Sequence, residues 1–373
     1  MHTLNRRHWL RLVGLAGAAT AAPGLSTAAV SNVPTYLPRL FDSDTPARLG
    51  LNENPYGPSP KVREAMVRAF DDACRYPSAY TKEIAQIIAR KEGVTPEHIV
   101  LTAGSSEGLK AAGLAFGMHG GEIVSPDPTF HILMNYAEQM GAHIHRVPLN
   151  KDMGHDLEAM EKRVHSNTRL VFVCNPNNPT GTLIPAQQMR DFCRALAGRA
   201  IVFADEASFD YITEPGYPSM VELVKQDYNV IVSRTLSKIY GLAGVRVGYL
   251  VARPDIALRL SGYCMAGLSV LAASAAKTAL QDNDFYQFSL QRNAEAKAYT
   301  CALLDSLGLR YVPSHANFVF FESGKDVNQL NAAMMQENVQ VGRAFPPYNR
   351  WCRVSTGTMP EMERFGKALK KLV

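Results

Sequence analysis

The sequence has none of the cysteine patterns that build metal sites or redox centres. Its six cysteines, among 373 residues, include no Cys-x-x-Cys pair and no set with metal-ligand spacing. Most of them lie inside apolar segments, where free buried thiols are expected. We therefore expect no metal site.

Strong charge of one sign and long apolar runs are missing too. The net charge of +5 is modest and spread along the chain, so nothing favours binding to nucleic acid. The longest apolar run, residues 12–22, is too short to span a bilayer comfortably, which excludes stable membrane insertion. No repeat or low-complexity tract occurs beyond the N-terminal region. A hydrophobic fraction of 46% and a charged fraction of 20% are instead typical of a globular protein.

The N-terminal residues resemble an export signal. A basic head that contains Arg6 and Arg7 precedes the apolar run, and small residues follow as far as Ala29. Consecutive arginines are typical of the bacterial twin-arginine type. We expect residues 1–29 to be a signal peptide and the protein to be exported, to the periplasm of a bacterium. The alternative is an amphipathic helix of the mature protein.

Short apolar strands and helical periods alternate over some 150 residues. We expect strands at 98–101, 122–125, 143–147, 169–174, 200–204, 229–232 and 247–251, and helices around 106–117, 129–141, 156–165 and 185–197. Such alternation favours an α/β fold with a mostly parallel central sheet that is covered on both faces. In these folds ligands bind at the carboxyl ends of the strands.

The rhythm of the sequence changes on either side of this region. Long helices are expected at 268–282 and 284–306, followed by shorter strands around 317–321 and 351–355. Before it, Ser59-Pro60 should cap one helix and another should span 81–92. We therefore expect four parts: the signal at 1–29, an N-terminal arm and part of a small domain at 30–74, a large domain at 75–262 and a small α+β domain at 263–373.

One stretch, residues 230–249, dominates the chemistry. A buried strand, Val230-Ile231-Val232, leads into Ser233-Arg234-Thr235-Leu236-Ser237-Lys238. A lysine flanked by hydroxyls, with Arg246 nearby, suits a cofactor that carries both an aldehyde and a phosphate. The amine can form a Schiff base, and Thr235, Ser237 and Arg246 can donate to the phosphate. Taken alone, a Ser-Lys pair is more often a solvated loop.

Three other strand ends and one C-terminal arginine add polar groups. Thr102-Ala103-Gly104-Ser105-Ser106 leads into a helix, whose first amides attract phosphate. Asn175-Pro176-Asn177-Asn178-Pro179-Thr180-Gly181 forms a polar turn, and Asp205-Glu206 ends another buried strand. Arg353 lies in a short strand and is suited to bidentate capture of a carboxylate.

Together these motifs resemble the fold-type I pyridoxal-phosphate aminotransferases. The resemblance rests on the Asn-Pro-x-Asn-Pro-Thr-Gly turn, then Asp205-Glu206-Ala207, then Ser237-Lys238 with Arg246 eight residues on. Leu51-Asn52-Glu53-Asn54-Pro55 and Arg75-Tyr76-Pro77 are similar to the histidinol-phosphate aminotransferase-like branch. The resemblance covers the chain from about residue 48 onward.

The resemblance implies a reaction and a set of roles. An amino group would move between an amino acid, or a histidinol-phosphate-like amine, and a 2-oxo acid in a ping-pong reaction. Lys238 would bind pyridoxal phosphate as a Schiff base and carry the proton. Asp205 would pair with the pyridine nitrogen, Phe130 would stack on the ring, and Asn178 would contact the phenolic oxygen and the substrate.

Further roles follow from the same resemblance. The phosphate would be held by Ser105, Ser106, Thr235, Ser237 and Arg246. A second copy of the chain would supply Tyr76 to that phosphate, so the resemblance implies a homodimer with shared active sites.

The remaining implied roles concern the substrate, and the sequence departs from the family pattern at Ser208, at Gly262-Tyr263-Cys264 and in the residues around Arg343. Arg353 would bind the α-carboxylate, and Arg343 lies where the histidinol-phosphate enzymes place an arginine for the substrate phosphate. Ser208 stands where the family usually has tyrosine directly after Asp-Glu-Ala, and Tyr211 could replace the missing hydroxyl or pack elsewhere.

Other functions remain open at this point. Gly104-Ser105-Ser106-Glu107-Gly108 fits the nucleophile elbow of a serine hydrolase with Ser106 as nucleophile, and Asp205 and His315 follow in suitable order. That alternative leaves Lys238 idle, as does a non-catalytic exported binding protein. Racemases, decarboxylases and oxidases of amino acids share the implied fold.

Overall fold

A seven-stranded sheet forms the centre of the larger part of the chain. In the computed structural model, which describes residues 45–265 and 267–373, the strand order is β2-β8-β7-β6-β5-β3-β4. The strands are β2 (Ile99–Thr102), β3 (Glu122–Asp127), β4 (His143–Pro148), β5 (Thr168–Cys174), β6 (Ile201–Asp205), β7 (Val230–Thr235) and β8 (Gly248–Val251). Strands β3 to β7 pair in parallel, and β8 runs antiparallel to both β7 and β2. The prediction of a mostly parallel sheet is therefore confirmed.

Alternate residues of each strand face two separate hydrophobic cores. In β5, Val171 and Val173 enter one core, whereas Leu170 and Phe172 enter the other. Because both faces are covered, inner strands such as β5 are apolar along nearly their whole length, which is typical of buried parallel sheets. The helices α4 (Ser105–Gly117), α5 (Ile132–Gln139) and α9 (Pro254–Ser261) cover one face, and α3 (Ser78–Glu92), α6 (Leu157–Lys162), α7 (Ala186–Leu196), α8 (Val221–Val224) and α10 (Val270–Ala279) cover the other.

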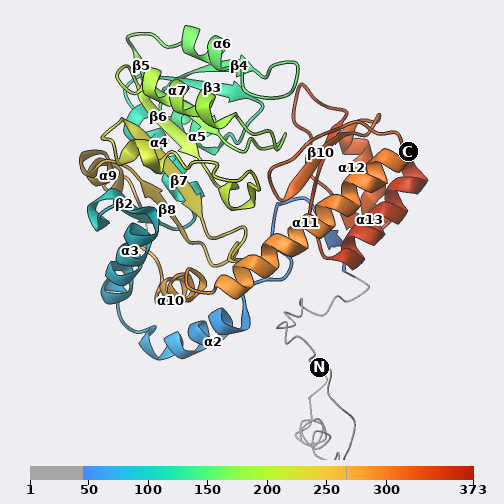
Figure 1. Ribbon diagram of the computed structural model, residues 1–373, viewed down its shortest axis with the longest axis horizontal. Coiled ribbons are helices and arrows are strands. Elements are labelled where there is room, and N and C mark those ends of the chain that lie inside the picture. Colours follow the sequence, from blue (N-terminus) through green and yellow to red (C-terminus); the bar gives the residue numbers. More distant parts are fainter. Residues whose placement is uncertain (1–44, 266) are drawn as a thin grey trace, which may run out of the picture. The chain divides into compact units, whose positions relative to one another are not determined.

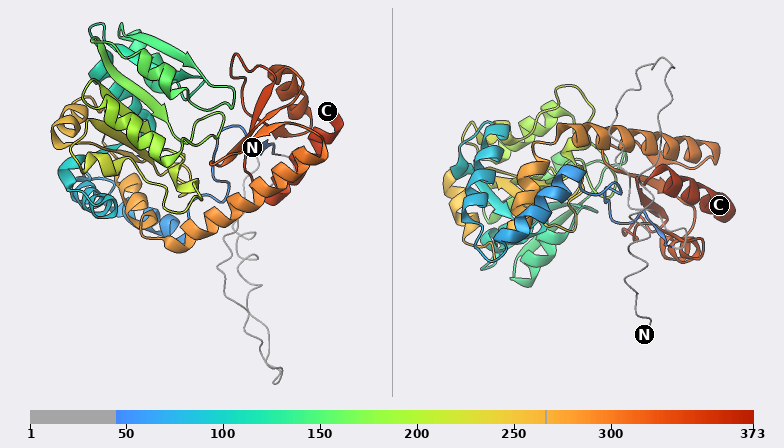
Figure 2. Two further views of the ribbon diagram at one scale, coloured as in Figure 1. Left: turned by 45° about the horizontal axis from the view of Figure 1, so that its top comes forward. Right: turned by 90° about the horizontal axis from the view of Figure 1, so that it is seen from below.

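A second, smaller group of elements follows α10. The 24-residue helix α11 (Asn283–Ser306) runs from α10 towards α12 (Val327–Gln336) and α13 (Met359–Leu372), as Figures 1 and 2 show. These helices pack on an antiparallel sheet of order β12-β10-β9, made by β12 (Trp351–Ser355), β10 (Phe318–Glu322) and β9 (Tyr311–Val312). N-terminal residues join this group, because β1 (Ala47–Arg48) pairs in parallel with β11 (Val339–Gln340). The domain boundaries themselves stay a prediction.

Local sequence signals explain where several helices begin and end. Ser59 caps α2 (Pro60–Arg68) as predicted, because its Oγ accepts from the Val62 amide at 3.3 Å. Helix α3 begins at Ser78, three residues before the predicted start, and ends at Gly93 in the left-handed conformation. Helix α5 begins at Ile132 and not near 129, because Thr129 is fully buried and donates its hydroxyl to the side chain of Asn177.

Several sequence predictions concern what lies outside these elements. The proposed signal peptide lies outside the described residues. Within 45–265 and 267–373, no helix combines the length and the apolar character needed to cross a membrane, and no group of three or more His, Cys, Asp or Glu side chains is arranged to hold a metal ion. The six cysteines are free, and Cys74 is the exposed one.

Candidate active site

The carboxyl ends of three neighbouring strands meet at one edge of the central sheet. Cys174 of β5 lies beside Asp205 of β6, and Asp205 lies beside Ser233 of β7. The polar turn after β5 and the Lys238 loop after β7 therefore emerge next to the Asp205 carboxylate. This is the edge at which an α/β sheet binds its ligand.

A tight turn after β7 presents Lys238. The Ser237 amide donates to Thr235 Oγ1 at 3.1 Å, and the Gly241 amide donates to the Lys238 carbonyl at 3.0 Å. Gly241 has a φ of 68°, and a Cβ atom there would lie 2.3 Å from the Gly57 carbonyl oxygen. Only glycine permits this approach, which closes residues 50–57 over the lysine loop.

The Lys238 amine is partly accessible and poised for chemistry near neutral pH. Its Nζ donates to the carbonyl oxygens of Asn52 at 2.9 Å and Leu51 at 3.3 Å. Burial, and next the positive charge of Arg353, lower the pKa of Lys238 to about 8. A larger fraction of this amine is therefore neutral at pH 7 than for an ordinary lysine, as a nucleophile or base requires.

Asp205 is a buried carboxylate with an unsatisfied oxygen atom. Its side chain is 2% exposed, and Oδ1 has no hydrogen-bond partner among the described residues. Burial raises the pKa of Asp205 to about 7. A protonated ring nitrogen would supply the missing donor and charge, so this carboxylate fits the pyridine nitrogen of pyridoxal phosphate.

The residues predicted to hold phosphate also come together. Helix α4 begins at Ser105 after Gly104, whose φ is 80°. A Cβ atom on Gly104 would lie 2.1 Å from a guanidinium nitrogen of Arg246, so the arginine packs directly against the start of the helix. Arg246 Nη1 donates to Ser237 Oγ at 3.2 Å. A guanidinium beside a helix N-terminus and a hydroxyl is suited to bind a phosphate.

A cavity of about 680 Å³ opens beside Lys238. Among the residues that line it are Phe130, Asn178, Arg343 and Arg353. The loop of Phe130 and the turn of Asn178 are held together by the hydrogen bond between Thr129 and Asn177 described above. The structure thus brings Lys238 together with four residues that the sequence predicted to contact the cofactor ring or the substrate.

The two arginines of this cavity differ in their environments. Arg353 is 7% exposed and donates from Nη1 to Asn178 Oδ1 and from Nη2 to the Gly50 carbonyl, both at 2.6 Å. Burial, and next the charge of Arg343, lower the pKa of Arg353 to about 10. Arg343 is exposed, and its guanidinium lies 4.3 Å from the centre of the Phe345 ring. One arginine is fixed in the wall of the cavity and the other lies at its solvent side.

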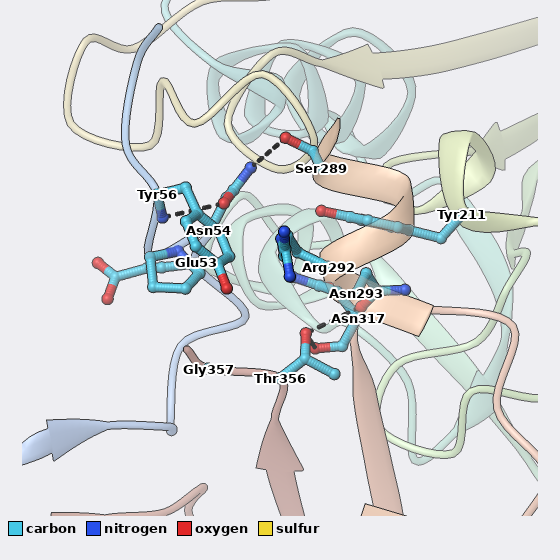
Figure 3. A pocket seen from close by; sticks show the side chains of 11 residues that line it. Glu53, Asn54, Tyr56, Tyr211, Ser289, Arg292, Asn293, Asn317, Thr356 and Gly357 are labelled. Carbon is cyan, nitrogen blue, oxygen red and sulfur yellow. Dashed lines mark hydrogen bonds between the residues drawn. The ribbon is translucent and has the colours of Figure 1, made fainter. Parts of the chain in front are cut away.

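Four further sequence candidates are not among the residues that line this cavity. Tyr76 is 96% exposed and Ser208 is 8% exposed. Tyr211 is buried in the short 3-10 helix η3 (Phe209–Tyr211) and lines a separate small cavity of about 10 Å³, shown in Figure 3. In the hydrolase alternative, His315 would act as base, and its backbone amide donates to the Gly181 carbonyl at 2.9 Å.

The sequence did not predict one part of the site. Carbonyl groups of Gly50, Leu51 and Asn52 accept hydrogen bonds from Arg353 and Lys238. The available signal was the turn-rich motif that begins at Leu51, which carried a family resemblance but no assigned role. Asn331, Met335 and Gln340 also line the large cavity without having been predicted.

Fold and site together define a pyridoxal-phosphate enzyme of fold type I. A family model described as aminotransferase class I and II matches residues 45–369, and the chain belongs to this family. The protein is a pyridoxal-phosphate-dependent aminotransferase. This membership leaves the hydrolase and binding-protein alternatives without support.

Individual relatives and solved structures agree with the family. The histidinol-phosphate aminotransferase of Moorella thermoacetica is 38% identical over 330 residues, which cover 87% of this chain and 85% of the relative. That of Halalkalibacterium halodurans is 34% identical over 318 residues, 84% of this chain and 86% of the relative. A crystal structure of histidinol-phosphate aminotransferase from Sinorhizobium meliloti in complex with pyridoxal-5'-phosphate is similar with a TM-score of 0.81 at 28% identity, over 88% of this chain and 92% of that one.

Proposed function

We propose that Lys238 is the lysine that binds the cofactor and moves the substrate proton, and that the transferred amino group comes from an amine with an anionic substituent. The observation that carries this proposal is the cavity in which Lys238, Arg343 and Arg353 meet. None of the described residues that line this cavity is Asp or Glu. A pocket with three cations and no carboxylate favours an anionic ligand.

The residues around the cofactor have separate tasks in this proposal. Bound pyridoxal phosphate supplies a carbonyl for Schiff-base formation and a ring that accepts electrons. Asp205 keeps the ring nitrogen protonated, Phe130 packs on the ring, and Asn178 donates to its phenolic oxygen. Lys238 takes the proton from the substrate Cα and later returns it at the cofactor carbon.

The phosphate of the cofactor has its own set of ligands in this proposal. The amides of Ser105 and Ser106, with Thr235, Ser237 and Arg246, hold it. The packing of Arg246 on Gly104 supports this set.

The substrate is proposed to be an amino acid or a histidinol-phosphate-like amine, with a 2-oxo acid as acceptor. Arg353 is buried, and its Nε–H has no hydrogen-bond partner among the described residues, so it can donate to a carboxylate or phosphate oxygen. Arg343 lies where it can contact the distal part of the same molecule. The names of the relatives make histidinol phosphate the first amine to test.

A donor panel without acceptor tests this function. Holoenzyme is mixed with histidinol phosphate, with amino acids and with uncharged amines, and loss of the visible cofactor band is followed in a single turnover. We expect anionic donors to react and Lys238→Ala to lose turnover by about 10³-fold or more. The matched control is Lys151→Ala at an exposed lysine. Near-normal turnover by Lys238→Ala, or equal rates with uncharged amines, would contradict the proposal.

We further propose a homodimer in which Tyr76 reaches the phosphate site of the second copy. The 96% exposure of this ring supports the proposal, because so large an aromatic surface is suited to an interface. Sedimentation should give a dimer, and Tyr76→Ala should weaken cofactor binding without changing the fold. A monomer with full activity would contradict it.

We propose export through a twin-arginine signal because Arg6 and Arg7 precede a short apolar run that small residues follow. Because that route carries folded cargo, the enzyme would load its cofactor in the cytoplasm before export to the periplasm. Replacing both arginines by lysine should leave active holoenzyme in the cytoplasm. Unchanged export of that variant would reject the assignment.

A further inference from the structure

The segment Gly50–Asn52 turns three successive carbonyl groups towards the cations of the active site. The Gly50 carbonyl accepts from Arg353, and those of Leu51 and Asn52 accept from Lys238 Nζ. Hydrogen-bond acceptors on a lysine stabilise its charged form. These carbonyls therefore matter most when Lys238 carries a proton.

Asn52 adopts a backbone conformation that aims its carbonyl at the lysine. Its φ is 55°, in the left-handed region, which costs free energy for any residue with a side chain. Asn52 is 3% exposed and is clamped in place by Ser355, whose Oγ accepts from the Asn52 amide at 2.8 Å and donates to Asn52 Oδ1 at 2.9 Å. One serine hydroxyl thus satisfies both the backbone and the side chain of Asn52.

A third residue, Asn317 directly before β10, holds the Asn52 carbonyl. Asn317 Nδ2 donates to the Asn52 carbonyl at 3.0 Å, and Asn317 is 1% exposed. Figure 3 shows Asn317 among polar side chains of α11 and of the segment after Asn52, where Asn54 bonds Ser289. The Asn52 carbonyl therefore has one donor supplied by the scaffold and one supplied by Lys238.

The strand β12 connects this clamp to the substrate. Ser355 lies two residues after Arg353, so both side chains leave the same face of the strand. Both contact the segment Gly50–Asn52, Arg353 at its start and Ser355 at its end. The same strand thus carries the proposed carboxylate ligand and the residue that orients the acceptors of the lysine.

We propose that Asn52 and Ser355 are positioning residues for Lys238: together they hold the Leu51 and Asn52 carbonyls where these stabilise the lysine after it has taken the substrate proton. The inference rests on the proposed role of Lys238. In that step the Cα–H bond breaks, Nζ gains the proton, and the bonding electron pair stays with the substrate and the cofactor ring. Protonation adds one N–H bond on the substrate side, and the two N–H bonds that point to the carbonyls become charge-assisted hydrogen bonds of the ammonium.

Other charged groups face the same amine and also influence the pKa of Lys238. Arg353 of β12 and Arg246, before β8, disfavour the ammonium, whereas Glu53 and Asp205 favour it. Among the described residues, Nζ donates to the two carbonyls and not to these carboxylates. Moving the carbonyls should therefore change the basicity of Lys238 without changing the charges around it.

The test is Ser355→Ala, which removes the clamp and leaves every charged group in place. We expect kcat to fall about fivefold, the size of effect that one lost hydrogen bond gives, with KM within about twofold of wild type. The kinetic isotope effect with a Cα-deuterated donor should rise, because proton transfer becomes slower.

A second readout does not depend on turnover. Capture of pyridoxal phosphate by the apoenzyme needs the neutral amine, so its pH dependence follows the protonation of Lys238. Loss of the carbonyl acceptors disfavours the ammonium, and the midpoint of capture should move to lower pH by about half a unit. A variant that is merely unstable would lower both capture and kcat, whereas here kcat falls and capture below the midpoint becomes faster.

The matched control is Ser323→Ala. Ser323 is a buried serine after β10 whose Oγ donates to the carbonyls of Lys325 and Arg350, away from the segment Gly50–Asn52. It should leave kcat, isotope effect and capture midpoint unchanged. The inference is wrong if Ser355→Ala leaves these quantities unchanged, or if Ser323→Ala alters them equally.

A second pair of variants decides the question if Ser355→Ala does not fold. Asn52→Gly keeps the left-handed backbone, whereas Asn52→Ala disfavours it. Asn52→Ala should lower kcat more than Asn52→Gly, and equal losses would overturn the inference. The inference and the proposed function fail on different results. An active Lys238→Ala variant would contradict the proposed function, whereas equal losses in the two Asn52 variants would contradict only the inference.

Discussion

Arg353 Nη1 donates to Asn178 Oδ1 at 2.6 Å, although the two residues are 175 positions apart in the sequence. The contact joins strand β12 of the smaller sheet to the turn that follows β5 of the central sheet. It places the proposed carboxylate ligand against a residue that the family resemblance assigns to both cofactor and substrate. Substrate bound to Arg353 therefore lies within reach of the cofactor side of the site.

Arg353→Ala should weaken every amino-acid donor by a similar factor. Arg353 is buried, so a carboxylate bound to it forms a desolvated charge pair, and we expect a loss of roughly 2–5 kcal/mol in transition-state binding. The measurement is kcat/KM across the donor panel, with the exposed Arg350→Ala as control. A loss confined to one donor would show that Arg353 recognises a side chain instead.

Arg343→Ala should change the order of the donors. Arg343 is exposed and stacks on Phe345 in the wall of the cavity, so we expect it to contact the variable part of the substrate. Donors with a distal phosphate or carboxylate should lose more than donors with an apolar end. Ratios of kcat/KM measure this, and a proportional loss for all donors would remove the selective role.

Asp205→Asn should stabilise the apoenzyme and impair the holoenzyme. Burial raises the pKa of Asp205 to about 7, so between about pH 4 and pH 7 the folded protein keeps a proton that the unfolded chain has lost. The free energy of unfolding of the apoenzyme should therefore fall as pH rises through this window, by up to about 4 kcal/mol.

Denaturant unfolding of both apoproteins at several pH values measures this effect. Asp205→Asn should flatten the pH dependence, because the amide does not ionise. Turnover of the cofactor-loaded variant should fall, because the ring nitrogen loses its counter-charge. Identical pH slopes in the two apoproteins would show that Asp205 is already paired in solution.

Ser208→Tyr tests the position where the sequence departs from its family. A tyrosine hydroxyl that reaches the phenolic oxygen of the cofactor would withdraw charge from it, and the pH midpoint of the visible cofactor band should then be lower than in wild type. Ser208 is 8% exposed, so circular dichroism must first show that the larger ring is accommodated. An unchanged midpoint in a folded variant means that another donor already occupies the place.

The fold was predictable where burial governs the sequence. Strand β7 is buried at all six residues, and its apolar start and polar end are visible as Val230-Ile231-Val232 followed by Ser233-Arg234-Thr235. Strand β5 also has a continuous apolar run, because each of its two faces packs into a hydrophobic core. Strands β1 and β11 show no such pattern, because two residues are too few to reveal an alternation of apolar and polar side chains.

The site was predictable where side chains do the chemistry and not where the backbone does. The side chains of Lys238, Asp205 and Arg246 are of types that indicate their proposed roles: an amine for a Schiff base, a carboxylate for a ring nitrogen and a guanidinium for a phosphate. The carbonyls of Leu51 and Asn52 belong to no residue type, and the structure joins them to Lys238 across 187 and 186 positions. The clamp by Ser355 is equally invisible, because a serine in a strand has no distinctive pattern.

The clamp on Asn52 also fixes when the site can form during synthesis. Asn52 leaves the ribosome among the first residues of the described chain, and Ser355 is among the last. Some 300 residues separate the two, so at a synthesis rate of about 5–20 residues per second Asn52 waits about 15–60 s for Ser355. The central sheet can fold around Lys238 in the meantime. The Leu51 and Asn52 carbonyls, however, are not yet held in position to accept from Lys238. Completion of the active site therefore waits until strand β12 has been synthesised and Ser355 can bond Asn52.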